Sequence, residues 1–125
     1  MKFKNMFSPI QIGPMTVKNR FVVPPMGNNF ANSDGTWSDE SVAYYGERAK
    51  GQFGLITIEA TVVHKGAKGG PKKPCLYDDN SIESLKKITD ACHEEGAKVS
   101  IQLQNAGPEG NAKNAGAPIQ AATAI

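Results

Sequence analysis

Short apolar runs alternate with longer stretches of helical periodicity along most of the chain. Continuous apolar or β-branched runs occupy residues 21–24, 54–60 and 98–104, and such runs are typical of strands buried on both faces. Between them, residues 38–51 and 80–96 place apolar side chains at helical spacing. The pattern predicts the order β-α-β-α-β. Apolar strands joined by helices indicate an α/β fold with a parallel sheet and right-handed crossovers.

Both predicted helices carry start and stop signals. Ser38 is placed to cap the first helix, and acidic residues follow it in the first turn. Asn80 followed by Glu83 resembles a capping box for the second helix, and Gly96 is placed to end it. Cys92 falls on the apolar side of that helix, so we expect it in the core.

Two flanking segments lie outside this alternation. Residues 8–19 alternate around Gly13 and Pro14, which predicts a small hairpin before the first strand of the sheet. Residues 105–125 are rich in Gly, Ala, Asn and Pro and have no periodicity. We therefore predict a loop-like tail that never returns to a helix.

The links that follow the strands are longer than those that precede them. Long loops are predicted at residues 25–37, at 61–79 and from 105 onward, whereas the helix-to-strand links are short. In α/β sheets and barrels, ligands bind where the strands end at their carboxyl edge. The segment "PPMGNN" follows the first strand of the sheet, and its small residues would let a ligand approach the backbone.

Composition narrows the class of protein. The chain has 125 residues, is 39% hydrophobic and has a formal net charge of +2, which suits one soluble globular unit. Its basic residues are spread out, so we expect no nucleic-acid partner. No long apolar run or signal-peptide core is present, so we expect no membrane partner and a cytoplasmic location. Cys75 and Cys92 lack metal-ligand spacing, and a reduced compartment is the default.

Polar residues at the predicted strand ends have two interpretations each. Gln102 either faces the wet end of the sheet, which we favour for a lone Gln, or pairs its amide with a ligand. Glu59 ends an apolar strand and needs a partner if buried, and we favour an ion pair with a Lys or Arg of a neighbouring strand. The second long loop carries four lysines that favour a solvated loop over phosphate capture: Lys65, Lys68, Lys72 and Lys73.

The ordered segments of the chain resemble a known family. "FSPIQIGPMTVKNRFVVPPMGNNF", "DGTWSDESVAYYGERAKGQFGLITIEATVV" and "GAKVSIQLQNAGPEG" are similar to the old yellow enzyme family of FMN-dependent oxidoreductases. They look most like its branch of enoate reductases, dienoyl-CoA reductases and bile-acid-inducible NADH:flavin oxidoreductases. The resemblance implies an eight-stranded β/α (TIM) barrel with FMN at its C-terminal mouth. It also implies that the opening hairpin closes the bottom of the barrel.

The resemblance assigns cofactor contacts to particular positions. The implied FMN-binding residues are Pro25, Met26, Gly27, Ala60 and Gln102. Some relatives have Thr or Cys at the position of Gly27, and that side chain tunes the flavin. Gly27 has no side chain that could do so. Gln102 matches an amide that bonds to the flavin pyrimidine edge, which alternates carbonyl and N–H groups. Where relatives often read "HAG" this chain has "NAG", so the usual role does not carry over to Asn105.

A complete barrel needs about 250 residues, and only three of its strands are predicted here. We therefore expect residues 1–125 to be the N-terminal segment of an oxidoreductase that reduces activated C=C bonds with NAD(P)H through FMN. The segment alone is expected to be inactive, whether it is a truncated gene product or an excised piece. The resemblance implies enone, enoate or enoyl-CoA substrates. Larger members of the branch also carry FAD and an iron–sulfur cluster, which this chain would not hold.

Two alternatives come from other classes. One is a segment of a non-flavin β/α-barrel enzyme, which would need a lysine or paired carboxylates at strand ends. The other is a non-enzymatic module that assembles through its sheet edges, because a short parallel sheet leaves two edges unpaired. In either case we expect a homo-oligomer.

Overall fold

Five strands form two separate sheets in the computed structural model, which describes residues 3–123. Strands β1 (Ile10–Ile12) and β2 (Met15–Val17) pair antiparallel, which confirms the predicted hairpin. Strands β3 (Val22–Val23), β4 (Leu55–Val62) and β5 (Lys98–Gln104) form a parallel sheet in the order β3-β4-β5. The α/β fold with a parallel sheet is therefore confirmed.

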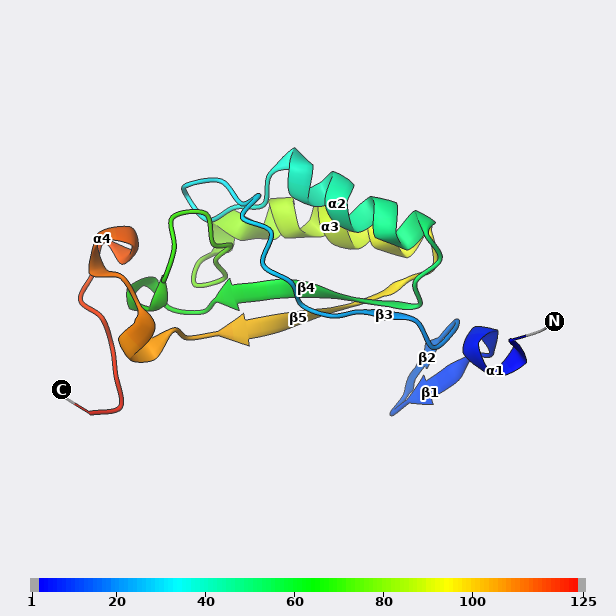
Figure 1. Ribbon diagram of the computed structural model, residues 1–125. Coiled ribbons are helices and arrows are strands. Elements are labelled where there is room, and N and C mark those ends of the chain that lie inside the picture. Colours follow the sequence, from blue (N-terminus) through cyan, green and yellow to red (C-terminus); the bar gives the residue numbers. More distant parts are fainter. Residues whose placement is uncertain (1–2, 124–125) are drawn as a thin grey trace.

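Two helices connect the parallel strands, and both lie on the same face of the sheet (Figure 1). Helix α2 (Asp39–Lys50) begins as predicted, because the Ser38 hydroxyl accepts the Ser41 N–H at 3.2 Å. The second one, α3 (Ile82–Glu94), starts later than predicted.

The predicted capping box of α3 is wrong. A 3-10 turn, η2 (Asp79–Ser81), precedes the helix, and the side chain of Asp78 accepts the Asn80 N–H at 3.1 Å. The Asn80 position therefore lies inside the turn rather than at the helix start. The end of α3 is as predicted, since Gly96 has a positive φ of 72°.

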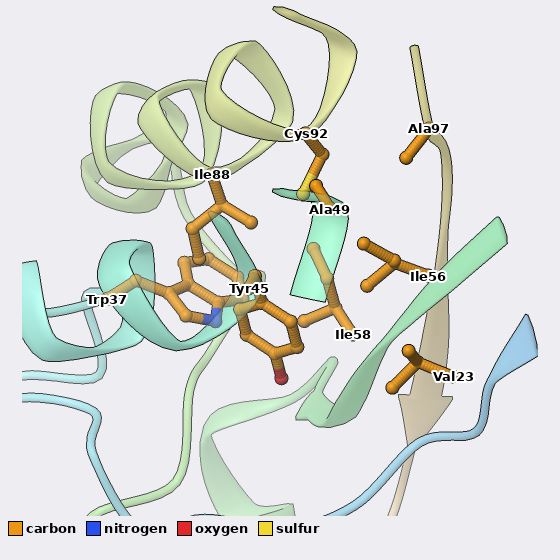
Figure 2. Packing of buried hydrophobic residues seen from close by; sticks show 9 residues of the cluster. All are labelled: Val23, Trp37, Tyr45, Ala49, Ile56, Ile58, Ile88, Cys92 and Ala97. Carbon is orange, nitrogen blue, oxygen red and sulfur yellow. The ribbon is translucent and has the colours of Figure 1, made fainter. Parts of the chain in front are cut away.

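The core lies between the sheet and the two helices (Figure 2). Its buried members come from β3, β4, both helices, the loop before α2 and the residue before β5: Val23, Trp37, Tyr45, Ala49, Ile56, Ile58, Ile88, Cys92 and Ala97. Burial of one large apolar side chain stabilises the fold by about 1.5–3 kcal/mol. Cys92 is fully buried in this cluster, as its helical position predicted.

The opposite face of the sheet has no helix over it in the described part of the chain (Figure 1). Burial alternates along β5, where Val99 and Ile101 pack against the core. Ser100 therefore points to the open face, and its hydroxyl lies 2.8 Å from that of Thr57 on β4. The prediction that β5 is apolar on both faces is wrong, because its alternate residues are polar.

The hairpin lies beside the N-terminal ends of the parallel strands, away from the strand arrowheads (Figure 1). The side-chain amide of Asn19 donates to the Gln52 carbonyl at 2.7 Å, and the Gly54 N–H donates to the Phe21 carbonyl at 3.0 Å. A Cβ at Gly54 would lie 2.7 Å from Asn19 Oδ1, so this close approach requires glycine. The first helix, α1 (Lys4–Phe7), adjoins the hairpin (Figure 1).

The tail contains two short helical turns, so the prediction of no helix there is wrong. They are η3 (Gly107–Glu109) and α4 (Ala112–Ala115). Asn111 caps α4 by accepting the N–H groups of Lys113 and Asn114, and Gly116 ends it at a φ of 60°. A single capped turn leaves no periodic signal in the sequence. Among the helices of residues 3–123, none is long and apolar enough to cross a membrane.

Candidate functional site

The register of the parallel sheet brings the candidate residues to one edge. Val23 pairs with Ile56, and Ile58 pairs with Ile101. Continuing β3 by four residues therefore places Gly27 at the level where β4 reaches Ala60, and the next residue of β5 after Ile101 is Gln102. Gly27 after β3, Ala60 near the end of β4 and Gln102 near the end of β5 thus share the carboxyl edge of the sheet.

The ladder between β4 and β5 is irregular at this edge. Ile58 pairs with Ile101 and Thr61 pairs with Leu103, so Glu59 and Ala60 together stand opposite Gln102. Such a bulge leaves one residue unpaired and re-aims its neighbours. The Glu59 N–H donates to the hydroxyl of Tyr45 on α2 at 3.0 Å. Burial raises the pKa of this tyrosine to about 12, so its hydroxyl stays protonated at neutral pH.

The five predicted cofactor residues are accessible to different degrees. Met26 is 45% exposed, Gly27 and Gln102 are exposed, and Pro25 and Ala60 are half-buried. Gln102 follows Ile101, which packs on the helix side, so the alternation of β5 directs it to the open face. Among the described residues, its amide has no hydrogen-bond partner.

The amide-rich turn after Gly27 has a structural cause. The side-chain oxygen of Asn28 accepts the Phe30 N–H at 2.9 Å, which closes a tight turn. Asn29 has a left-handed φ of 59°, a conformation that Asn tolerates better than most residues. Two successive asparagines therefore turn the chain directly after the exposed backbone of Gly27.

Glu59 is fully buried at the same edge. Its Oε2 accepts the Asn28 N–H at 3.3 Å, while its Oε1 has no partner in the described part of the chain. Burial raises the pKa of this carboxyl, and the Asn28 N–H and the positive charge of Lys73 act in the opposite direction. The predicted ion pair with a neighbouring strand is wrong: in residues 3–123, no lysine or arginine nitrogen lies within 4.0 Å of Glu59.

The second long loop is folded onto the first, so it is not the solvated loop predicted from its lysines. Lys68 is only 5% exposed, and its ammonium donates to the Ser33 carbonyl at 3.0 Å. Val62 forms an isolated bridge with Cys75, whose N–H donates to the Gly35 carbonyl at 2.9 Å. These bonds tie the loop after β4 to the loop after β3.

The same edge collects orphaned polar atoms. Three buried side-chain atoms lack a partner in the described residues, and two of them are Glu59 Oε1 and Asn28 Nδ2, with Trp37 Nε1 as the third. Buried polar groups without partners are rare in folded proteins. Two of them in residues that contact each other, such as Asn28 and Glu59, suggest a bound ligand or water. The exposed Gly27, the Met26 side chain and the Gln102 amide lie at this same edge of the sheet.

Sequence reasoning missed three residues of this site. Tyr45 had a usable signal, since Ser41, Tyr45 and Ala49 recur at helical spacing on the buried side of α2. Asn28 was noted only as part of a small-residue loop. Lys73 had no local signal, because only the fold of the loop brings it to Gly27.

The structure also has a cavity away from this edge, and its described residues form no cluster suited to a metal ion. A cavity of about 760 Å³ lies between the N-terminal ends of α2 and α3, where Trp37, Lys72 and Asn80 are among its lining residues. None of the five predicted cofactor residues lines it. Within residues 3–123, no cluster of His, Cys, Asp or Glu is arranged to hold a metal ion.

Solved structures of several oxidoreductases match most of this chain. The chain is 33% identical to a 2-naphthoyl-CoA reductase solved in complex with 2-naphthoyl-CoA, with a TM-score of 0.86 over 91% of this chain and 17% of that one. It is 34% identical to an old yellow enzyme from a Pichia species (TM-score 0.84, 91% and 30% covered). It is 31% identical to an old yellow enzyme homologue from Zymomonas mobilis (TM-score 0.83, 90% and 31% covered).

The chain thus spans less than a third of the length of each of these proteins. It corresponds to their N-terminal part, as the resemblance implied. A family model described as the NADH:flavin oxidoreductase / NADH oxidase family matches residues 5–123, which is nearly the whole chain. The subgroup is not fixed by these matches. The chain belongs to the NADH:flavin oxidoreductase / NADH oxidase family, which includes the old yellow enzymes.

Proposed function

We propose that this chain supplies the first part of an FMN site in an oxidoreductase that reduces activated C=C bonds with NAD(P)H. The observation that carries the proposal is the register of β3, β4 and β5, whose extension sets Gly27 level with Ala60 and leaves Glu59 and Ala60 opposite Gln102. Membership of a flavin-using family supports this assignment over a non-flavin barrel enzyme.

Each residue of the edge would have a distinct task. Bound FMN would accept a hydride from the nicotinamide and pass it to the substrate. Gln102 would pair its carbonyl and amino groups with the alternating donors and acceptors of the flavin pyrimidine edge. Gly27 would let the flavin approach the backbone, because no Cβ stands in the way. Pro25, Met26 and Ala60 would supply small or apolar contacts to the ring.

The substrate class follows from the relatives. One of them was solved with 2-naphthoyl-CoA, whose thioester carbonyl activates the conjugated ring system for hydride addition. We therefore propose enone, enoate or enoyl-CoA compounds as the substrates of the whole protein. The residues that would anchor such a substrate and the FMN phosphate are not among those proposed in this chain.

A chimera tests the proposal. Residues 5–123 would replace the matching segment of the Zymomonas mobilis homologue, with the unmodified homologue as the control. We expect a yellow protein with about one FMN per chain that reduces a cyclic enone with NAD(P)H. A chimera that unfolds cooperatively but is purified without flavin, and does not take it up, would contradict the proposal.

In the same chimera, Gln102→Leu should weaken FMN binding without unfolding the protein. Loss of one neutral hydrogen bond costs about 0.5–1.5 kcal/mol, which corresponds to roughly two- to twelvefold in the dissociation constant. Quenching of FMN fluorescence measures the constant. Gln11→Leu, an exposed glutamine on the hairpin, is the matched control and should have no effect. Equal constants for both variants would return Gln102 to a solvent-facing role.

A further inference from the structure

Two charged groups border the position that a side chain at residue 27 would occupy. A Cβ built on Gly27 would lie 3.0 Å from Lys73 Nζ and 3.7 Å from Glu59 Oε2. Gly27 is itself exposed at the end of β3. An ammonium and a carboxylate therefore stand beside the exposed backbone that follows the strand.

The side chain of Lys73 is partly shielded from solvent and lies near a buried carboxyl. Lys73 is half-buried, whereas its sequence neighbour Lys72 is exposed and lines the separate cavity near α2 and α3. Glu59 is fully buried, and a carboxylate in such a place needs a nearby positive charge if it is to stay ionised. The charge of Lys73 acts on that carboxyl and lowers its pKa against the effect of burial.

We propose that Lys73 is a further cofactor-contacting residue, whose ammonium lies beside Gly27 and near Glu59 and presents a positive charge to the flavin. This inference rests on the proposed function, because it takes the edge to be a flavin site. Glu59 is then a positioning residue: it acts on the Asn28 N–H and on Lys73 rather than on the cofactor. The fold in this way supplies a polar group where residue 27 has no side chain.

The chemical consequence concerns the reduced cofactor. A flavin gains electrons and negative charge on reduction, and an adjacent cation stabilises the reduced form more than the oxidised form. Lys73 should therefore raise the reduction potential of the bound flavin. An uncharged side chain of similar length at position 73 would lower the potential. Lys72 should have no such effect, because its side chain is exposed and lines the separate cavity.

The first test uses the chain itself and no flavin. Carbon-13 labelling of glutamate carboxyls would follow the titration of Glu59 in the wild type, in Lys73→Met and in Lys72→Met. Both variants lose one positive charge from adjacent positions. We expect the Glu59 pKa to rise in Lys73→Met and to stay at its wild-type value in Lys72→Met. The same titration in both variants would overturn the electrostatic coupling of Lys73 to Glu59.

The second test measures the flavin potential in the chimera described above. We expect a more negative potential for Lys73→Met than for Lys72→Met, and Lys73→Arg should restore most of the difference. If the chimera binds FMN and the two methionine variants have the same potential, the inference fails while the proposed function stands. If the chimera takes up no FMN, both fail, and the titration still decides whether Lys73 and Glu59 are coupled.

Discussion

At the scale of single residues, Glu59 is fully buried but only one of its two carboxylate oxygens has a hydrogen-bond partner in the described residues. One carboxylate oxygen accepts the Asn28 N–H, and the other has no partner among the described residues. Burial is the largest influence on its pKa and raises it above the ordinary value of 4.5. The folded protein therefore holds the proton of Glu59 more tightly than the unfolded chain does.

This raised pKa gives a definite sign to the pH dependence of stability. Between the unfolded and folded pKa values, the folded state binds more protons, so the free energy of unfolding falls as pH rises. Each unit by which the pKa is raised costs about 1.4 kcal/mol once the pH exceeds the folded value. Glu59→Gln removes this titration. We expect the wild type to lose stability relative to Glu59→Gln as pH increases from about 4 through the raised pKa.

Urea unfolding followed by circular dichroism at several pH values between 4 and 8 measures this difference. Glu94→Gln is the matched control, since Glu94 is exposed at the end of α3. A constant difference between wild type and Glu59→Gln across that range would show that the buried carboxyl does not titrate differently in the folded state.

The same residues mark how far sequence reasoning reached. Gln102 and Gly27 were proposed from their places at or after the ends of strands, which are local signals, and from the family resemblance. Lys73 and the burial of Glu59 depend on how the loop after β4 folds back, and no pattern within that loop encodes the contact with Gly27. Lys68 was misjudged for the same reason, since its partner is the Ser33 carbonyl of another loop.

At the scale of elements, the local sequence pattern was enough to predict an element that packs along its whole length. The three parallel strands were predicted from continuous apolar runs, the hairpin from alternation around Gly13 and Pro14, and helix α2 from its capping signal. The start of α3 and the tail were wrong, since η2 and α4 are single turns held by side-chain caps. Such turns are too short for a repeating pattern.

The contact between the two loops after β3 and β4 gives a test at this scale. Gly35 has a φ of 93°, and a Cβ there would lie 2.7 Å from Cys75 Sγ. Gly35→Ala should therefore add both backbone strain and overpacking, and each costs about 1–3 kcal/mol. Gly13→Ala is the matched control, because Gly13 has a φ of 55° but no atom within 4 Å of the added carbon.

We expect Gly35→Ala to lose about 1–3 kcal/mol more unfolding free energy than Gly13→Ala, chiefly because the added carbon overpacks against Cys75. Chemical unfolding of both variants at neutral pH provides the comparison. Equal losses would mean that the Cys75 side chain moves aside freely and that the two loops are not tightly packed at this point.

At the scale of the whole molecule, the helices cover one face of the sheet and leave the other open (Figure 1). The open face is mixed rather than apolar, since Thr57 and Ser100 bond to each other across it. The outer edges of β3 and β5 pair with no strand in residues 3–123. Exposed apolar side chains stand on these edge strands, with Val22 47% exposed and Leu103 63% exposed.

Unpaired edges of this kind favour association, so we predict that the chain is a homo-oligomer at micromolar concentration. A second copy would pair its backbone with the free edge of β5 or β3 and cover the exposed Val22 and Leu103 side chains. A lysine on an edge strand opposes such pairing. Leu103→Lys should therefore shift the protein towards monomer without unfolding it, because the Leu103 side chain is largely in solvent. Sedimentation velocity over a range of concentrations measures the equilibrium, with the exposed Lys98→Ala on the same strand as the control. A wild-type chain that sediments as a monomer and unfolds cooperatively at micromolar concentration would contradict the prediction.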